Sequence, residues 1–179
     1  MRKQQFSRSI RRKRLKGIVI SVLLFLFLGM GFFSYFYFYV QDQKEDDYAF
    51  AKQQALEGTP IKEIESTERF HGKFYYVTVY GVDEDNNALF AFVPMEDNDE
   101  DIHYVYKNEG VSQEEVLDYW NRECRDCSLN DIKLGFTSQI PVWELTYEDE
   151  HERYVFDYFR FDNGERYEQY RLKPNQAFR

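Results

Sequence analysis

Cysteine and histidine, which build many catalytic and metal centres, are scarce in this chain of 179 residues, which has two cysteines and three histidines. The histidines His71, His103 and His151 show no metal-ligand spacing with cysteine, aspartate or glutamate, so we interpret them as surface residues. The sequence also lacks the G-x-S-x-G, H-E-x-x-H, P-loop and glycine-rich dinucleotide motifs. We therefore expect no catalytic residue, no cofactor and no metal ion.

Long flexible linkers are also missing, since no Pro-rich or Gly/Ser-rich stretch occurs, and the parts of the chain should be closely coupled. The first 16 residues contain eight basic residues and no acidic one. Removing this charge of +8 from the net charge of −9 leaves −17 for the rest of the chain. So acidic a protein repels phosphates, which argues against nucleic acid as a partner.

One uncharged stretch of 24 residues, Gly17–Val40, contrasts with the charged remainder. As a helix it would be roughly 36 Å long, enough to cross the hydrocarbon core of a bilayer, which is roughly 30 Å thick. Its last third carries Tyr35, Tyr37 and Tyr39 among phenylalanines, which is typical of an aromatic belt at the headgroups. The stretch predicts a transmembrane anchor.

The flanking charges predict the orientation of this anchor. Residues 1–16 form a basic tail, whereas four acids and one lysine follow within 41–47. The positive-inside rule places the tail in the cytoplasm and the C-terminal domain outside the cell. A cleaved signal peptide is the alternative. It is disfavoured because the apolar run exceeds the length of an h-region and no A-x-A-like site follows it.

Helix and strand patterns alternate beyond the anchor. Helix formers fill 45–57, ended by Gly58 and Pro60, and no breaker separates this helix from the span. Aromatic and β-branched runs then predict strands over 61–70, 74–82, 88–95 and 101–107. The acidic runs 83–86 and 96–101 between strands could hold Ca²⁺, but they lack the glycine and distal glutamate of an EF-hand, so we interpret them as solvated loops.

The same pattern then restarts. Ser112 and Glu115 form a capping box at the start of a helix over 113–124. Strands are expected around 132–136 and over 141–147, 153–161 and 165–172, with a tight turn at 162–164.

Two copies of helix, strand, hairpin and strand, about 67 residues apart, therefore follow the anchor, and Tyr76–Tyr80 aligns with Trp143–Tyr147. The predicted fold class is α+β, with one N-terminal transmembrane helix followed by two units that each place one helix on a small antiparallel sheet. We expect these units over 41–109 and 110–174. Units this small are marginally stable alone, so they should pack against each other.

Three segments resemble a known family: GKFYYVTVYGVDEDNNALFAFVP, GVSQEEVL, and PVWELTYEDEHERYVFDYFRFDNGE. They are similar to the TseB-like cell wall elongation regulators, which are built from tandem PepSY-like domains. The turn Asp162-Asn163-Gly164 matches the end of the PepSY pattern. The heavy load of tyrosine and phenylalanine and the two cysteines depart from it.

The resemblance implies a non-enzymatic protein of Gram-positive bacteria. Its expected partner is a class B penicillin-binding protein, which is a transpeptidase, or another cell wall synthesis protein, and its expected role is to modulate elongation. It implies no catalytic residue and no small-molecule substrate. An extracytoplasmic protease inhibitor or sensor module is the alternative, and a thiol oxidoreductase that uses Cys124 and Cys127 is a third hypothesis.

The pair Cys124 and Cys127 has two interpretations, a local structural disulfide or two unreactive thiols. Redox activity is disfavoured because the pair lies at a helix C-terminus, where the helix dipole disfavours a thiolate. A zinc tetrad would need a second C-x-x-C motif, which the chain lacks.

Aromatic residues are the remaining signal. In the strand over 154–161, Tyr154, Phe156 and Tyr158 should point to one face of the sheet, and Val155, Phe159 and Phe161 to the other. The face away from the helix either packs on the sister unit or stays open as a docking surface. As candidate interface aromatics we select Tyr154, Phe156, Tyr158 and Phe159.

Overall fold

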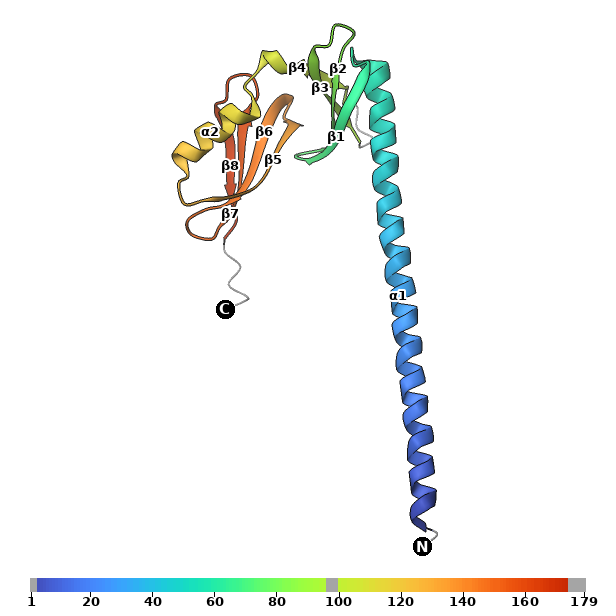
Figure 1. The fold of residues 1–179 in the computed structure, drawn as a ribbon. Helices are drawn as coiled ribbons and strands as arrows, with labels where there is room; N and C mark the ends of the chain where they lie inside the picture. The colour runs from blue at the N-terminus through green and yellow to red at the C-terminus, as the bar shows by residue number, and fades with distance from the viewer. Residues whose placement is uncertain (1–2, 96–99, 174–179) are drawn as a thin grey trace. The chain divides into compact units, whose positions relative to one another are not determined.

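A computed structural model describes residues 3–95 and 100–173 (Figure 1). Side chains are described from Gly17 to Tyr37 and from Glu45 onward within these ranges. The chain divides into two compact units, Met1–Asp46 and Asp47–Arg179. The acidic run 96–101 lies mostly outside the described residues, so its interpretation as a solvated loop stays a prediction.

Helix α1 spans Lys3–Gly58 without interruption. Its segment Gly17–Tyr37 is long and apolar enough to cross a membrane. The helix expected over 45–57 is the end of α1, which agrees with the lack of a breaker before it. α1 ends at Gly58, where the Thr59 hydroxyl donates a hydrogen bond of 2.7 Å to the carbonyl of Ala55.

Two antiparallel sheets of four strands follow, which confirms the predicted α+β class. The first sheet consists of β1 (Glu63–His71), β2 (Tyr75–Val82), β3 (Ala88–Pro94) and β4 (His103–Tyr106). The second sheet consists of β5 (Ser128–Thr137), β6 (Ile140–Glu148), β7 (Tyr154–Arg160) and β8 (Arg166–Arg171). In each sheet the strands lie side by side in chain order.

The two sheets repeat one plan in detail. The first strand of each has a register shift near its start, between Ile64 and Ser66 in β1 and between Leu129 and Asp131 in β5. β5 is longer than the expected strand around 132–136, because its polar first residues pair with β6 from Ser128 onward. That part of β5 is exposed and gives no hydrophobic signal in the sequence.

The C-terminal part of α1 covers one face of the first sheet. Ala51 and Ala55 are completely buried there, and their small side chains let the helix approach the strands closely. They belong to one cluster with Ile61, Val77, Val79, Leu89, Ala91 and Val93. Asp47 of α1 links the helix to this face of the sheet. Its carboxylate accepts hydrogen bonds of 2.8 Å from Arg69 Nη2 of β1 and from the Tyr75 hydroxyl of β2.

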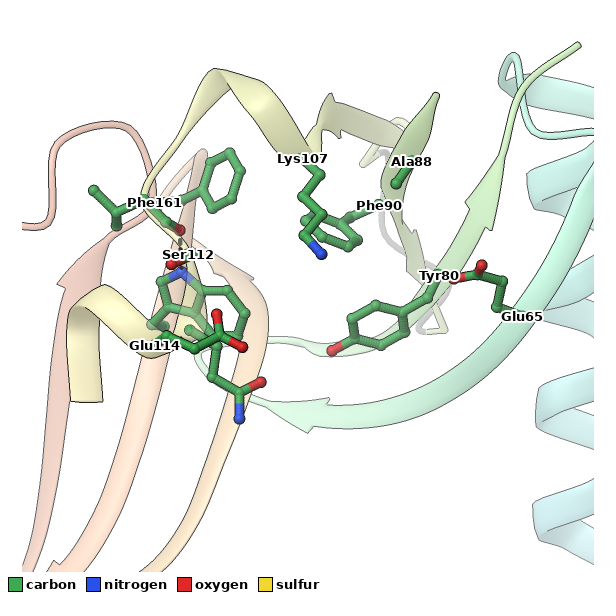
Figure 2. A pocket seen from close by; sticks show the side chains of 11 residues that line it. Glu65, Tyr80, Ala88, Phe90, Lys107, Ser112, Glu114 and Phe161 are labelled. Atoms are coloured by element: carbon green, nitrogen blue, oxygen red, sulfur yellow. Dashed lines mark hydrogen bonds between the residues drawn. The ribbon is translucent and has the colours of Figure 1, made fainter. Parts of the chain in front are cut away.

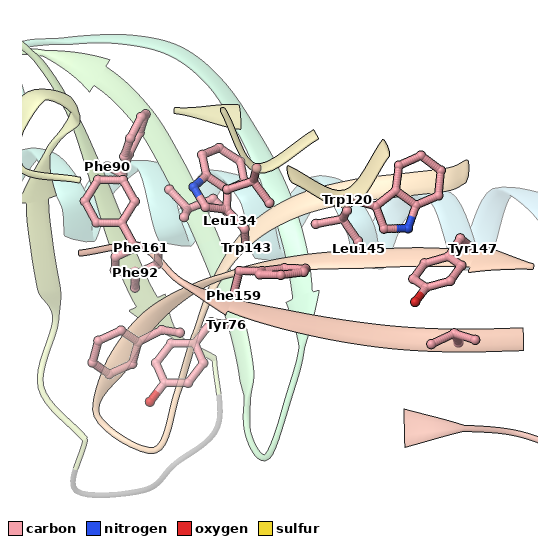
Figure 3. Packing of buried hydrophobic residues seen from close by; sticks show 13 residues of the cluster. Tyr76, Phe90, Phe92, Trp120, Leu134, Trp143, Leu145, Tyr147, Phe159 and Phe161 are labelled. Atoms are coloured by element: carbon pink, nitrogen blue, oxygen red, sulfur yellow. The ribbon is translucent and has the colours of Figure 1, made fainter. Parts of the chain in front are cut away.

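The other face of the first sheet packs on the second sheet. Tyr76, Phe90 and Phe92 share one buried cluster with aromatic and aliphatic residues of β5, β6, β7 and helix α2 (Figure 3). Phe136 of β5 lies near the centre of the contact, with ring centroids 5.5 Å from Tyr76 and 5.3 Å from Phe92. The Thr78 hydroxyl also donates a hydrogen bond of 2.8 Å to the carbonyl of Leu134.

Helix α2 (Gln113–Glu123) covers one face of the second sheet. Its start is the predicted capping box: Ser112 Oγ accepts from the Glu115 amide, and Glu115 Oε2 accepts from the Ser112 amide. Its buried residues are Val116 and Trp120, and the Trp120 ring lies 5.4 Å from that of Tyr147 on β6. The 3₁₀ turn Lys107–Glu109 leads into this helix.

One histidine differs from its expected place. His71 and His151 are exposed, as predicted for surface residues. His103 is half-buried, and its ring stacks on Phe136 with centroids 4.5 Å apart. The reason is that His103 lies opposite Phe92 on β4 and so shares the face that packs on the second sheet.

Candidate functional site

The face of the second sheet that points away from α2 carries partly exposed aromatic side chains, and we call it the open face. Three of the four predicted interface aromatics, Tyr154, Phe156 and Tyr158, lie on it because they alternate with buried residues along β7. Tyr170 of β8 lies opposite Phe156 and joins them. Tyr154 is 38% exposed and Tyr170 50% exposed, so a partner can reach both rings.

Phe159 does not belong to this surface, although it was selected with the other three. It is completely buried in the shared cluster (Figure 3), and its ring lies 5.6 Å from that of Tyr119 on α2. The alternation along β7 places Phe159 on the helix side of the sheet, where α2 covers it. Phe159 therefore stabilises the fold and cannot contact a partner at the open face.

Carboxylates stand between the aromatic rings of the open face. Cross-strand pairing places Glu144 and Glu168 on either side of Tyr158 and places Glu148 opposite Tyr154. Burial and the neighbouring Glu144 carboxylate raise the pKa of Tyr158. Partial burial of Glu144 raises the pKa of this carboxyl above its ordinary value. Tyrosine is enriched at protein interfaces, because it offers both contact area and a polar tip.

A second group of half-buried polar residues borders the open face at the contact between the sheets. Glu68 of β1 accepts a hydrogen bond of 3.0 Å from the Tyr80 hydroxyl, and burial raises the pKa of Glu68. Lys133 of β5 forms an ion pair of 2.8 Å with Asp131. Glu68 and Lys133 thus each have a partner of their own, which offsets the cost of partly burying their charges.

A hollow of about 200 Å³ lies at the other end of the contact between the sheets (Figure 2). Tyr80 and Phe90 of the first sheet line it, with Trp143 and Phe161 of the second part. The Trp143 ring nitrogen donates a hydrogen bond of 3.0 Å to the carbonyl of Val111, which fixes one wall. Its volume is below the usual range for ligand pockets.

Asp157 forms a buried polar network on the helix side of β7. Its side chain has no exposure and accepts hydrogen bonds of 2.8 Å from both Arg166 Nε and Gln169 Nε2. The Tyr147 hydroxyl donates to the same carboxylate at 3.2 Å, and burial raises the pKa of Tyr147 to about 12. Arg166 also pairs with Glu123 at the end of α2. Sequence reasoning missed this network, because an aspartate among aromatic residues has no local signal of a buried partner.

Cys124 and Cys127 are joined in a disulfide directly after α2, with Cα atoms 5.5 Å apart. Cys124 caps the helix, and its amide donates a hydrogen bond of 2.9 Å to the Trp120 carbonyl. Both cysteines pack against the shared cluster. Within residues 3–95 and 100–173, no group of three or more His, Cys, Asp or Glu could hold a metal ion.

Comparisons with known proteins agree with this architecture. The family model "Cell wall elongation regulator TseB-like domain" matches residues 51–94. Over 122 residues, the chain is 28% identical to the probable cell wall elongation regulator TseB of Bacillus subtilis (strain 168). The aligned region covers 68% of this chain and 75% of that relative. The solved structure of the YpmB protein from Bacillus subtilis matches this chain with a TM-score of 0.64 at 25% identity, and the match covers 69% of this chain and 96% of the YpmB chain. In both sequence and fold, the chain is therefore similar to the TseB-like cell wall elongation regulators.

Proposed function

We propose that this chain is a membrane-anchored extracytoplasmic regulator of peptidoglycan elongation that binds a class B penicillin-binding protein. The observation that carries the proposal is the family likeness, which covers about two thirds of the chain at the level of both sequence and fold. The related protein is itself named a probable cell wall elongation regulator. A role without catalysis is part of the proposal, since a regulator can act by binding alone.

The proposed topology follows from the charge on either side of the apolar helix. Residues 1–16 lie in the cytoplasm, 17–40 span the membrane, and 41–109 and 110–174 form two PepSY-like units outside it. The helix segment Gly17–Tyr37 supports the anchor by its length and apolar composition. The eight basic residues before it support the orientation.

The open face is the proposed contact for the partner. Tyr154 lies at its rim and is accessible, and Phe156 packs beside it with ring centroids 5.2 Å apart. Exposed aromatic residues held in place by neighbours are suitable interface anchors, because little side-chain entropy is lost when a partner covers them.

Photo-cross-linking in intact cells tests the partner. A benzoylphenylalanine at position 154 should cross-link to a transpeptidase or another elongation protein, identified by mass spectrometry. Tyr104 of β4 is 45% exposed and lies on the first sheet, so the same probe at position 104 is the matched control. Recovery of no cell wall synthesis protein from position 154, or equal recovery from both positions, would count against the proposal.

Protease treatment of whole cells tests the topology. With the proposed orientation, protease added outside should remove the C-terminal part and leave a short membrane-bound fragment that contains the basic tail. A C-terminal part that resists protease until the cells are lysed, or mature protein free in the medium, contradicts the anchor and its orientation.

A further inference from the structure

A groove of about 400 Å³ lies where the β1–β2 turn reaches the open face. It is lined by the turn His71–Lys73, by Thr137 and Ser138 at the end of β5, and by Tyr158, Glu168 and Tyr170 of β7 and β8. Its volume falls within the range of pockets that hold small ligands or single units of a polymer.

The aromatic wall of this groove is held in a defined orientation. The rings of Tyr158 and Tyr170 meet edge to face, with centroids 6.1 Å apart and an interplanar angle of 83°. This contact orients the two rings, which contribute apolar surface to the lining of the groove.

The polar part of the lining offers donors and acceptors together. Lys73 is a donor, Glu168 is an acceptor, and the hydroxyls of Thr137 and Ser138 can act as either. Ser138 and its neighbour Gln139 both adopt positive φ, at 47° and 66°, in a turn where glycine or asparagine is usual. This tight turn contributes Ser138 to the lining of the groove.

This lining selects among classes of ligand. A purely apolar ligand does not fit, because hydroxyls and charged groups line much of the groove. A highly charged ligand does not fit either, since Lys73 and Glu168 carry opposite charges. A pyranose ring does fit: it has an apolar face for stacking on an aromatic ring and hydroxyls at its rim that both donate and accept.

We propose that this groove binds an uncharged saccharide unit of a glycan strand. The inference rests on the proposed function, because that function places the groove outside the membrane, beside the cell wall. A regulator with such a groove would contact both the synthesis machinery through the rim of the open face and the glycan through Tyr158 and Tyr170.

Calorimetric titration of the full chain with N-acetylchitotetraose, a soluble uncharged glycan, tests the site. The protein is held in phosphatidylcholine nanodiscs, which contain no sugar that could compete. We expect saturable binding that Tyr170→Ala weakens about tenfold, since an exposed stacking ring is removed. Tyr167→Ala is the matched control: Tyr167 is also on β8 and 39% exposed, but it does not line the groove.

A second variant addresses the polar rim. Glu168→Gln keeps the size and acceptor oxygen of the side chain but removes its charge, so it should weaken binding less than Tyr170→Ala does. Absence of saturable binding at millimolar glycan, or equal weakening by Tyr170→Ala and Tyr167→Ala, overturns the inference. The cross-linking at position 154 is independent of the glycan, so failure of this inference is distinguishable from failure of the proposed function.

Discussion

Gly135 of β5 allows a close approach between the two sheets. A Cβ atom at this position would overlap the ring of Phe70, which is itself buried at 1% exposure. The backbone of β5 therefore lies directly against an aromatic side chain of β1. A single missing methyl group lets the two sheets share a core.

Gly135→Ala should lower the free energy of unfolding by about 1–3 kcal/mol, because the added methyl group forces the Phe70 ring out of its place. Urea denaturation of the full chain in micelles, followed by tryptophan fluorescence, measures the change. Gly29→Ala is the control, since no atom lies within 4 Å of a Cβ built there. An unchanged midpoint for Gly135→Ala would show that the contact is looser than described.

Arg166 compensates the buried charge of Asp157. Arg166→Met keeps an aliphatic chain over the Phe159 ring but leaves the carboxylate without its cation. We expect a loss of about 2–3 kcal/mol in the free energy of unfolding, because a buried charge with an unmatched partner is costly. Arg160→Met removes the exposed pair with Asp162 and should change stability little. Equal effects of the two variants, measured by urea denaturation, would contradict the assigned role of Arg166.

At the scale of elements, the turn between β6 and β7 depends on one carboxylate. Asp149 accepts hydrogen bonds from the amides of His151 and Arg153 and from the Arg153 guanidinium at 2.7 Å. Glu152 in the same turn has a positive φ of 57°, a conformation that a non-glycine residue adopts only with such support. These contacts set the register with which Tyr154 enters the open face.

The hydrogen bonds and charge of Arg153 lower the pKa of Asp149 from 3.8 to about 2. A lowered pKa means that the ionised carboxylate stabilises the folded protein at pH values above 3.8, and that this contribution is lost as the pH falls toward 2. Asp149→Asn should therefore have a lower Tm than the parent at pH 7. The difference should shrink between pH 4 and pH 2, as followed by circular dichroism. A difference in Tm that is independent of pH would show that the charge is not what matters.

The start of α2 shows how far local chemistry determines an element. Ser112 and Glu115 form the capping box that their spacing predicts, and the helix begins at Gln113, directly after Ser112. The same holds for the end of α1 at Gly58. The length of β5 did not follow from its own residues, because its exposed first half is a strand only through pairing with β6.

At the scale of the whole molecule, the shared cluster joins the two sheets in one compact unit. Phe136 of β5 contacts rings of Tyr76, Phe92 and His103, all from the first sheet. Neither sheet can lose this contact without exposing aromatic surface of the other. The two sheets pack against each other in this cluster, as expected for units this small.

Phe136→Ala should lower the free energy of unfolding by about 3–5 kcal/mol, because it leaves a cavity among three rings. Hydrogen exchange should accelerate in β2 and β3 as well as in β5 and β6, since both sheets lose the contact. Leu129→Ala, at a site that is 37% exposed on the same strand, is the control and should affect neither sheet strongly. Faster exchange confined to the second sheet would show that the sheets unfold independently.

The sequence by itself determined the apolar helix, the start of α2 and the repeated order of elements, because these depend on composition, periodicity and turn residues close together in the chain. Only the tertiary structure decided which aromatic residues a partner can reach. Tyr154 and Phe159 look alike in the sequence, but α2 covers one face of β7 and not the other, so Phe159 is buried and Tyr154 is accessible. The same is true of Gly135, His103 and the pair of Asp157 with Arg166, whose roles depend on residues that lie far from them in the sequence or on another face of the fold.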